Sequence, residues 1–174
     1  MKIRELCLKY GTDKDRYGDF YDFYLGRLKV ERFHLLEIGV QTGNSLRMWE
    51  EAFPLATITG VDIAPLQTYD NFRVETVTKD IKDYIPILRP TVIVDDGSHI
   101  ADDIVTAFHS LWKFLMPGGW YIIEDLAVQE SDNEAMQLIN DMVYDIAHLM
   151  HSFVSELHVH PNIVFMKKVA DAKD

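Results

Sequence analysis

Two short apolar runs near the middle of the chain, each ending abruptly in acidic residues, constrain the fold more than any other feature. They are Val92-Ile93-Val94-Asp95-Asp96-Gly97-Ser98-His99 and Tyr121-Ile122-Ile123-Glu124-Asp125. Apolar runs of this kind are typical of buried strands in a parallel sheet. Ligands of open α/β sheets bind just beyond the carboxyl ends of the strands. The two runs therefore predict a single edge of the sheet that carries Asp95, Asp96, His99, Glu124 and Asp125.

Such a gathering of acids needs a partner of opposite charge. Carboxylates that lie close together repel one another, so a cation, a proton or a positively charged ligand has to accompany them. Oxygen-rich carboxylate sites suit Mg²⁺, Ca²⁺ or Mn²⁺. The sequence therefore predicts a divalent-metal site at this edge.

Length and charge exclude several classes of function. A chain of 174 residues fits one domain with a sizeable core. Its 17 basic and 28 acidic residues give a net charge of -11, which argues against a nucleic-acid or anionic-membrane binder, because such proteins present a basic face. The single cysteine, Cys7, excludes an internal disulfide and favours a cytoplasmic location. No apolar stretch approaches the ~20 residues of a membrane span, and the N-terminus lacks a signal-peptide core.

Strand-like and helix-like segments alternate along the chain. We expect helices over residues 3–9, 19–28, 44–52 and about 133–153, and strands over 33–38, 57–62, 72–77, 92–95 and 120–124. Between the last two strands we expect a further helix, with Ile104, Val105, Phe108, Leu111, Trp112 and Leu115 on one face, and the chain closes in a hairpin of 154–159 and 163–168. This alternation predicts βαβ units and a mostly parallel sheet. The broad apolar surface of the helix over 133–153 suits core packing and leaves room for contact with a second copy, as in a homo-oligomer.

The first strand-turn-helix segment has the features of a nucleoside-cofactor site. Gly39 and Gly43 allow a tight turn and a close approach of the backbone to a ligand, and the helix that follows offers unpaired N–H groups. Asp62 ends the second strand, where an acid can accept both hydroxyls of a ribose. The dinucleotide fingerprint G-x-G-x-x-G is absent, with Gln41 in place of its second glycine, which argues against a dinucleotide oxidoreductase. Glu37, just before the turn, suits a ligand with a positive centre.

Four segments together resemble a known family. They are Lys9-Tyr10-Gly11-Thr12-Asp13-Lys14, Leu35-Leu36-Glu37-Ile38-Gly39-Val40, Asp95-Asp96-Gly97-Ser98-His99 and Ile123-Glu124-Asp125-Leu126. The chain resembles the class I S-adenosylmethionine-dependent methyltransferases, and among them the metal-dependent sugar O-methyltransferases of macrolide antibiotic pathways, the mycinamicin and macrocin type. The resemblance implies an α/β fold with a Rossmann-like, doubly wound, seven-stranded and mostly parallel sheet that closes in a C-terminal antiparallel hairpin. It also implies one domain over 1–174, with a helical cap over 1–32 and a Rossmann-like core over 33–174.

The resemblance further implies roles for individual residues. Around S-adenosyl-L-methionine it places Glu37, Gly39 and Gly43 at the methionine portion, Ser45 at the carboxylate, Asp62 at the ribose, Asp80 at the adenine, Asp95 near the methionine end, and Thr12 and Lys14 in a covering loop. Asp96, Glu124 and Asp125 would bind Mg²⁺ or Mn²⁺. His99 would be the general base beside Asp96. Glu124 and Asp125 are adjacent, so both can bind one ion only if the strand ends there and the chain turns.

Three functions remain open on the sequence. The first is methyl transfer to a sugar or glycoside hydroxyl, in which a divalent ion lowers the pKa of the hydroxyl and an imidazole removes its proton. The second is metal-dependent methyl transfer to a catechol-like or other small acceptor. The third is a nucleotide-binding or sugar-binding module without catalysis, against which the intact set of acids and histidine argues.

Overall fold

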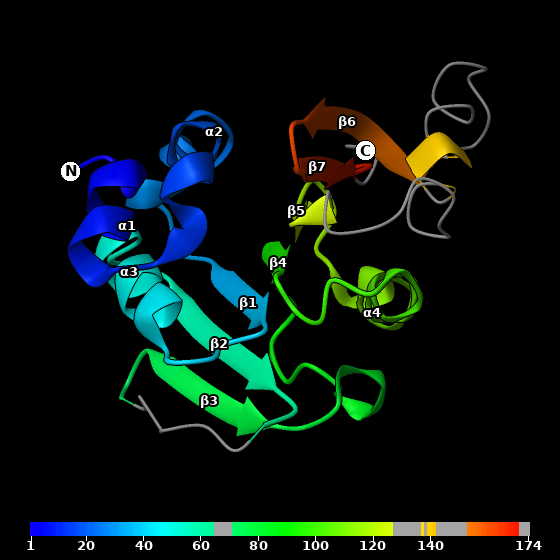
Figure 1. Ribbon diagram of the computed structural model, residues 1–174, viewed down its shortest axis with the longest axis horizontal. Helices are drawn as coiled ribbons and strands as arrows, with labels where there is room; N and C mark the ends of the chain where they lie inside the picture. The colour runs from blue at the N-terminus through cyan, green and yellow to red at the C-terminus, as the bar shows by residue number, and fades with distance from the viewer. Residues whose placement is uncertain (65–70, 127–136, 138, 142–152, 171–174) are drawn as a thin grey trace. The chain divides into compact units, whose positions relative to one another are not determined.

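The structure is a computed structural model that describes residues 1–64, 71–126, 137, 139–141 and 153–170. The chain divides into two compact units, Met1–Asp80 and Ile81–Asp174, and each is described by itself (Figure 1). The expected organisation as one domain with a cap over residues 1–32 stays a prediction.

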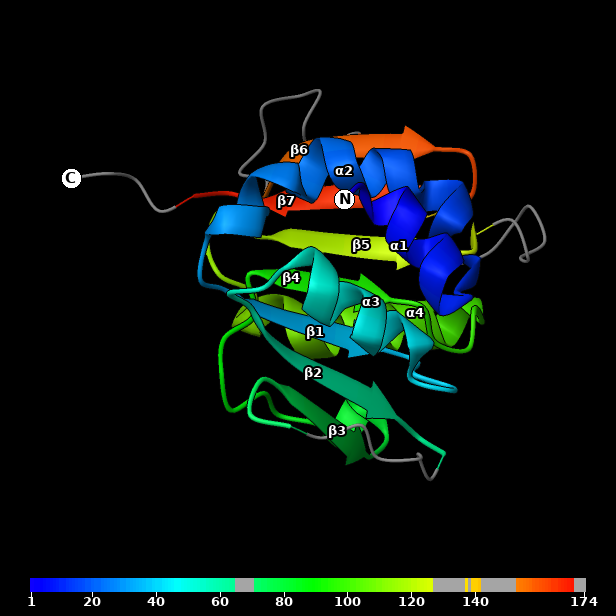
Figure 2. The same ribbon diagram turned by 90° about the vertical axis from the view of Figure 1, so that its left-hand side faces the viewer.

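The first unit consists of short helices and three parallel strands. Its elements are α1 (Ile3–Tyr10), η1 (Asp13–Tyr17), α2 (Gly18–Leu25), η2 (Gly26–Val30), β1 (His34–Ile38), α3 (Asn44–Ala52), β2 (Thr57–Asp62) and β3 (Val74–Thr78). All five residues of β1 are buried, as expected for a central parallel strand. Figure 2 shows α3 lying over β1 and β2, with α1 beside α3. The edge-to-face contact of Tyr21 and Trp49, with ring centroids 4.9 Å apart, joins α2 to α3 in the core.

The second unit pairs two parallel strands with an antiparallel hairpin. Its elements are η3 (Ile81–Asp83), β4 (Val92–Asp95), α4 (Ala101–Leu111), η4 (Trp112–Phe114), β5 (Trp120–Glu124), β6 (Val154–His160) and β7 (Ile163–Lys168). The apolar face of α4 includes Ile104, Phe108 and Leu111, all buried. Phe108 packs edge-on against Tyr121 of β5, with ring centroids 5.2 Å apart. β5 pairs parallel with β4 and antiparallel with β7.

The seven strands have the order β3-β2-β1-β4-β5-β7-β6, which confirms the predicted mostly parallel sheet with its closing hairpin. β1, α3, β2, β4, β5 and the hairpin follow the predicted ranges to within one residue. The third strand begins at Val74, two residues later than expected, and the helix expected over 19–28 changes to a 3₁₀ helix at Gly26. The helix expected over 133–153 lies largely outside the described residues, of which 137 and 139–141 are helical.

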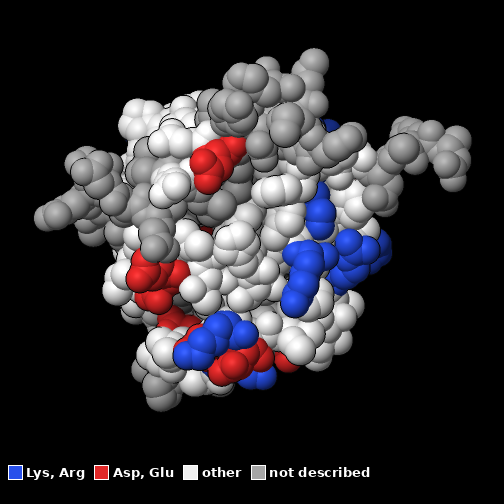
Figure 3. Space-filling model, turned by 90° about the vertical axis from the view of Figure 1, so that its right-hand side faces the viewer, with Lys and Arg blue, Asp and Glu red and all other residues white. Residues whose placement is uncertain are grey.

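Charged side chains of both signs share the surface. On the face drawn in Figure 3, basic and acidic residues lie directly against each other at the lower edge of the view, and other groups of each sign are separated by uncharged surface. Within the described ranges, no helix has the length and apolar character needed to cross a membrane.

Candidate functional site

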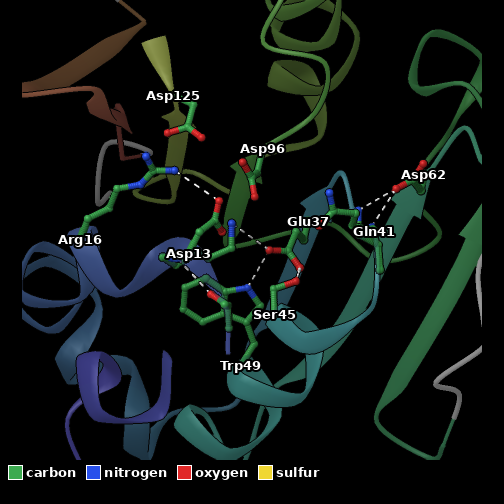
Figure 4. Close-up of polar contacts among 12 residues, drawn as sticks. Asp13, Arg16, Glu37, Gln41, Ser45, Trp49, Asp62, Asp96 and Asp125 are labelled. Carbon is green, nitrogen blue, oxygen red and sulfur yellow. Dashed lines mark hydrogen bonds and ion pairs between the residues drawn. The ribbon is translucent and has the colours of Figure 1, made fainter. Parts of the chain in front are cut away.

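The glycine turn between β1 and α3 is held by hydrogen bonds to another residue of the first unit. Gly39 and Gly43 have φ angles of 82° and 76°, and Gln41 between them has φ 50°, so three of the five turn residues occupy the left-handed region that glycine tolerates best. The backbone N–H groups of Val40 and Gln41 donate to Oδ2 of Asp62 at 2.8 and 3.1 Å (Figure 4). Asp62 therefore holds the glycine turn in place, and its role at the ribose stays a prediction.

The charge on Asp62 is stabilised by these backbone donors. Partial burial, the largest single influence, raises the pKa of this carboxyl, but the N–H groups of Ala64, Val40, Gln41 and Ile63 together bring it below its ordinary value. Asp62 therefore stays ionised. A carboxylate has about four acceptor positions, so this arrangement is compatible with further donors such as ribose hydroxyls.

β2 packs so closely against the turn that position 60 also requires glycine. Gly60 of β2 pairs with Glu37 of β1, and a Cβ at this position would lie 2.6 Å from a methyl carbon of Val40 and 2.9 Å from one of Leu46. A side chain at position 60 would therefore displace the turn or the first turn of α3. The glycine count of the sequence gave no reason to single out this position.

Glu37 is completely buried; two side chains donate hydrogen bonds to it and a third forms an ion pair with it. The Ser45 hydroxyl donates to Oε2 at 2.7 Å, and the Trp49 indole N–H donates to Oε1 at 3.1 Å. The ammonium of Lys14 lies 3.4 Å from Oε1, and both side chains of this ion pair are at most 1% exposed. Figure 4 shows Ser45 and Trp49 of α3 converging on Glu37. Glu37 is therefore already compensated by its own unit.

The remaining predicted cofactor residues of the first unit lie in loops. Thr12 is the N-cap of η1, where its hydroxyl accepts a hydrogen bond from the backbone N–H of Lys14 at 3.1 Å. That cap fixes the start of the segment that carries Lys14 into the core. Asp80 follows β3 and is half-buried. The cofactor roles of these residues and of Ser45 stay predictions.

The second unit brings three of the predicted residues together. Asp96, His99 and Asp125 each offer one ligand atom, and these atoms lie within 4.8 Å of one another. His99 Nε2 is 3.8 Å from Oδ1 of Asp96 and 3.9 Å from Oδ2 of Asp125. These separations are longer than hydrogen bonds. We call Asp96, His99 and Asp125 the acid-histidine cluster.

Two of its members have an uncommon backbone. Asp125 has φ 58° and His99 has φ 59°, a conformation that non-glycine residues adopt rarely and that often marks functional sites. β5 ends at Glu124, and the chain turns at Asp125. Such a turn is required if Glu124 and Asp125 are to bind the same ion. Glu124 is buried and is not a member of the acid-histidine cluster among the described residues. Its role as a metal ligand stays a prediction.

The loop before α4 fixes His99. The Ser98 hydroxyl donates to Asp103 at 2.6 Å and accepts from the backbone N–H of Ile100 at 3.2 Å. This local network ties the residues on both sides of His99 to the first turn of α4. The imidazole is therefore presented by a braced loop.

Asp95, the acid before the cluster, is buried and bonded to Tyr121. The Tyr121 hydroxyl donates to Oδ2 of Asp95 at 3.1 Å. Burial raises the pKa of Asp95 to about 7, although the Tyr121 hydroxyl and the N–H of Gly97 lower it, and the charges of Asp96 and Asp103 raise it further. Asp95 is therefore held in the core by Tyr121, and its predicted place near the methionine end of the cofactor stays a prediction.

Four contacting residues were not predicted as site residues from the sequence. Trp49 and Tyr121 look like ordinary core aromatics, yet each donates a hydrogen bond to a site carboxylate. Gly60 and Asn162 have signals that appear only once strand register is known. The sequence places Asn162 in the turn between the two strands of the closing hairpin, and this position does not indicate that it contacts Asp125.

Comparisons with known proteins identify relatives of this chain. No protein-family model matches the sequence. The chain is 30% identical to the 8-demethyl-8-alpha-L-rhamnosyl tetracenomycin-C 2'-O-methyltransferase of Streptomyces olivaceus, over 96% of this chain and 54% of that protein. It is 28% identical to the demethylmacrocin O-methyltransferase of Streptomyces fradiae, over 95% of this chain and 53% of that protein.

A solved structure shares the fold. The MycE methyltransferase of the mycinamycin biosynthetic pathway, in complex with Mg, SAH and mycinamycin VI, matches with a TM-score of 0.88 and 27% identity, over 98% of this chain and 55% of that one. The chain spans about half the length of the curated relatives it matches. The chain therefore has the fold of the class I S-adenosylmethionine-dependent methyltransferases and is a homologue, over about half of their length, of the sugar O-methyltransferases of the macrocin and mycinamicin type.

Proposed function

We propose that the protein is a magnesium-dependent S-adenosylmethionine O-methyltransferase that acts on a hydroxyl of a sugar or glycoside. The observation that carries this proposal is the convergence of Asp96, His99 and Asp125 at the ends of β4 and β5. The relatives named for sugar O-methylation and the MycE complex with Mg and SAH support it.

The residues of the two units suit both a divalent metal ion and S-adenosylmethionine. Asp96 and Asp125 supply carboxylate oxygens, which are the ligands that Mg²⁺ and Mn²⁺ prefer, and Glu124 is the predicted third acid. The glycine turn, with the left-handed backbone at Gly39 and Gly43, allows close approach of a cofactor to the first turn of α3. Asp62, held ionised at the end of β2, suits two ribose hydroxyls.

The reaction needs a nucleophilic oxygen, and a sugar hydroxyl holds its proton near neutral pH. A bound divalent ion would lower the pKa of that hydroxyl. Nε2 of His99 would accept the proton, because it faces both Asp96 and Asp125, where the acceptor would be positioned. S-adenosylmethionine would supply the methyl group to the acceptor oxygen, and His99 would hold the proton taken from the hydroxyl until solvent removes it.

The same cluster admits a second arrangement of roles. His99 Nε2 lies nearly equally far from both carboxylates, so the imidazole could instead be a third metal ligand. The two arrangements predict different metal binding by a His99 variant.

The acceptor is proposed to be a small glycoside rather than a nucleic acid, since the net charge of -11 disfavours a polyanion. The proposed cytoplasmic location rests on the single cysteine, Cys7, which is buried and has no second cysteine with which to form an internal disulfide. Association into a homo-oligomer stays a prediction, because the helix on which it was based lies largely outside the described residues.

The test combines binding with turnover. Calorimetry should show binding of S-adenosylhomocysteine, and Mn²⁺ titration should show one divalent-ion site that Asp96→Asn and Asp125→Asn remove without loss of S-adenosylhomocysteine binding. Methyl transfer should then be assayed with mycinamicin VI, a rhamnosyl glycoside and catechol. Transfer only to catechol would redirect the proposal to the small-acceptor class. Binding without any transfer would favour a non-catalytic module, and activity that survives exhaustive chelation would remove the metal.

A further inference from the structure

The antiparallel hairpin brings a turn residue beside the acid-histidine cluster. β5 and β7 pair with the register Trp120↔Lys167 through Glu124↔Ile163. In an antiparallel pair, each step forward on one strand is a step backward on the other. One step beyond Glu124 and Ile163 therefore sets Asp125 opposite Asn162. A parallel final strand would not bring the turn that precedes it to this end of β5.

Two hydrogen bonds occupy this extension of the ladder. The amide Nδ2 of Asn162 donates to Oδ1 of Asp125 at 3.0 Å, and the backbone N–H of Leu126 donates to the carbonyl oxygen of Asn162 at 3.4 Å. Asn162 has φ 68° and Asp125 has φ 58°. Two left-handed residues thus face each other at the end of β5, and the amide side chain joins them.

The contact divides the two oxygens of Asp125. Oδ1 accepts from Asn162, whereas Oδ2 is the atom that lies 3.9 Å from Nε2 of His99. Because the side chain of Asp125 is mostly buried, rotation of its carboxyl group would break the hydrogen bond from the amide of Asn162. A ligand carboxylate held in this way keeps one defined oxygen directed at the ion.

We propose that Asn162 is a positioning residue for the metal site, and that its amide orients Asp125 so that Oδ2 faces the cation. This inference rests on the proposed function, in which Asp125 binds the ion. Asn162 itself contacts neither the ion nor the substrate. Outer partners of this kind are typically worth about 10–100-fold in metal affinity.

A purely structural reading is that Asn162 serves the turn, because asparagine tolerates a positive φ better than most residues. The substitution Asn162→Gly separates the two readings, since glycine adopts the same backbone conformation but has no amide side chain. Pro161→Gly is the matched control, because it loosens the same turn and leaves the amide in place. Asp125→Asn serves as the reference for loss of a ligand.

The experiment measures Mn²⁺ affinity by titration with electron paramagnetic resonance, alongside S-adenosylhomocysteine binding and thermal unfolding. We expect Asn162→Gly to weaken Mn²⁺ binding by about 10–100-fold, with S-adenosylhomocysteine binding unchanged. The Mg²⁺ concentration that gives the half-maximal rate should rise by a similar factor, and the rate at saturating Mg²⁺ should largely recover. Pro161→Gly should bind Mn²⁺ as the wild type does.

Each other outcome counts against the inference. If Asn162→Gly binds Mn²⁺ like the wild type while Asp125→Asn does not, the positioning role is wrong and the proposed metal site stands. If Pro161→Gly weakens Mn²⁺ binding as strongly as Asn162→Gly, the effect belongs to the turn. If the wild type binds no divalent ion, the proposed function and this inference both fail.

Discussion

The two units differ in what surrounds the carboxylates of their predicted sites. In the first unit, Glu37 is paired with Lys14 and accepts from Ser45 and Trp49. In the second unit, Asp96 and Asp125 approach one imidazole at distances beyond hydrogen bonding. The first unit is thus balanced by its own chain before any ligand arrives. The second gathers like charges that an added cation would relieve, so the units should respond differently to the loss of a single side chain.

The largest effect is expected on turnover, from the second unit. His99→Ala should lower methyl transfer by about 10²–10⁴-fold, the usual worth of a general base. Affinities for Mn²⁺ and S-adenosylhomocysteine should stay close to those of the wild type, because neither binds through His99. Stopped assays at saturating metal and cofactor measure the rate. A loss of Mn²⁺ binding in this variant would show instead that His99 is a metal ligand.

The next effect is expected on stability, from the first unit. Lys14→Met leaves the buried Glu37 without its cation, which should cost about 3–5 kcal/mol in the free energy of unfolding. Urea denaturation measures this cost. Adding Glu37→Gln should recover much of it, because the uncompensated charge is then gone. Lys9→Met is the matched control, since the pair of Lys9 with Glu51 is solvent-exposed and should matter little.

The units should also differ in the pH dependence of their stability. Burial lowers the pKa of His34 in β1 to about 4, against which its bond to Thr57 acts weakly. Because the folded state disfavours protonated His34, neutral His34 makes its full contribution to the free energy of unfolding above pH 6.5. That contribution is lost as pH falls toward 4. The pKa of Asp95, raised by burial to about 7, acts in the opposite direction, because its contribution is lost as pH rises from 3.8 toward 7.

The wild type should lose up to about 3 kcal/mol of unfolding free energy through His34 as pH falls, and His34→Gln should not show this loss. The measurement is the difference between wild-type and variant unfolding free energies at pH 4 to 7, with chelator present. His109→Gln, at an exposed position on α4, is the control. Parallel profiles for wild type and His34→Gln would contradict the assignment.

The smallest effect is expected at the cofactor turn. Asp62→Ala should weaken S-adenosylhomocysteine binding by about 1–3 kcal/mol, because it removes an acceptor for the ribose and also frees the N–H groups of Val40 and Gln41. Calorimetry measures the change. Mn²⁺ affinity should be unaltered, since the acid-histidine cluster belongs to the other unit. Equal binding by both proteins would exclude Asp62 from the cofactor site.

Local patterns were enough to predict the elements and the acid-rich strand ends. Apolar runs with defined stops gave β4 and β5 at their observed ranges, because a buried parallel strand leaves a continuous apolar signature. The glycine turn and the gathering of Asp96, His99 and Asp125 followed from the rule that ligands bind at carboxyl ends.

The contacts that hold the site depend on long-range pairing, which a single sequence does not display. Lys14 looks like a loop lysine, yet it is buried against Glu37, 23 positions later in the sequence. Tyr121 has the pattern of a core aromatic, and its hydroxyl partner is known only once β4 and β5 are aligned. Asn162 meets Asp125 only through the antiparallel register. Side-chain partners of this kind are set by the fold, so they could not be predicted from local patterns.

The pairing of Asn162 with Asp125 also sets an order in time. Every contact of the glycine turn described above lies within residues 1–80, which leave the ribosome before the residues of the second unit. The contact that orients Asp125 requires residue 162, and the hairpin that presents it spans Val154 to Lys168. During synthesis the contacts of the cofactor turn can form early, whereas the acid-histidine cluster has to wait for the closing hairpin before it is complete.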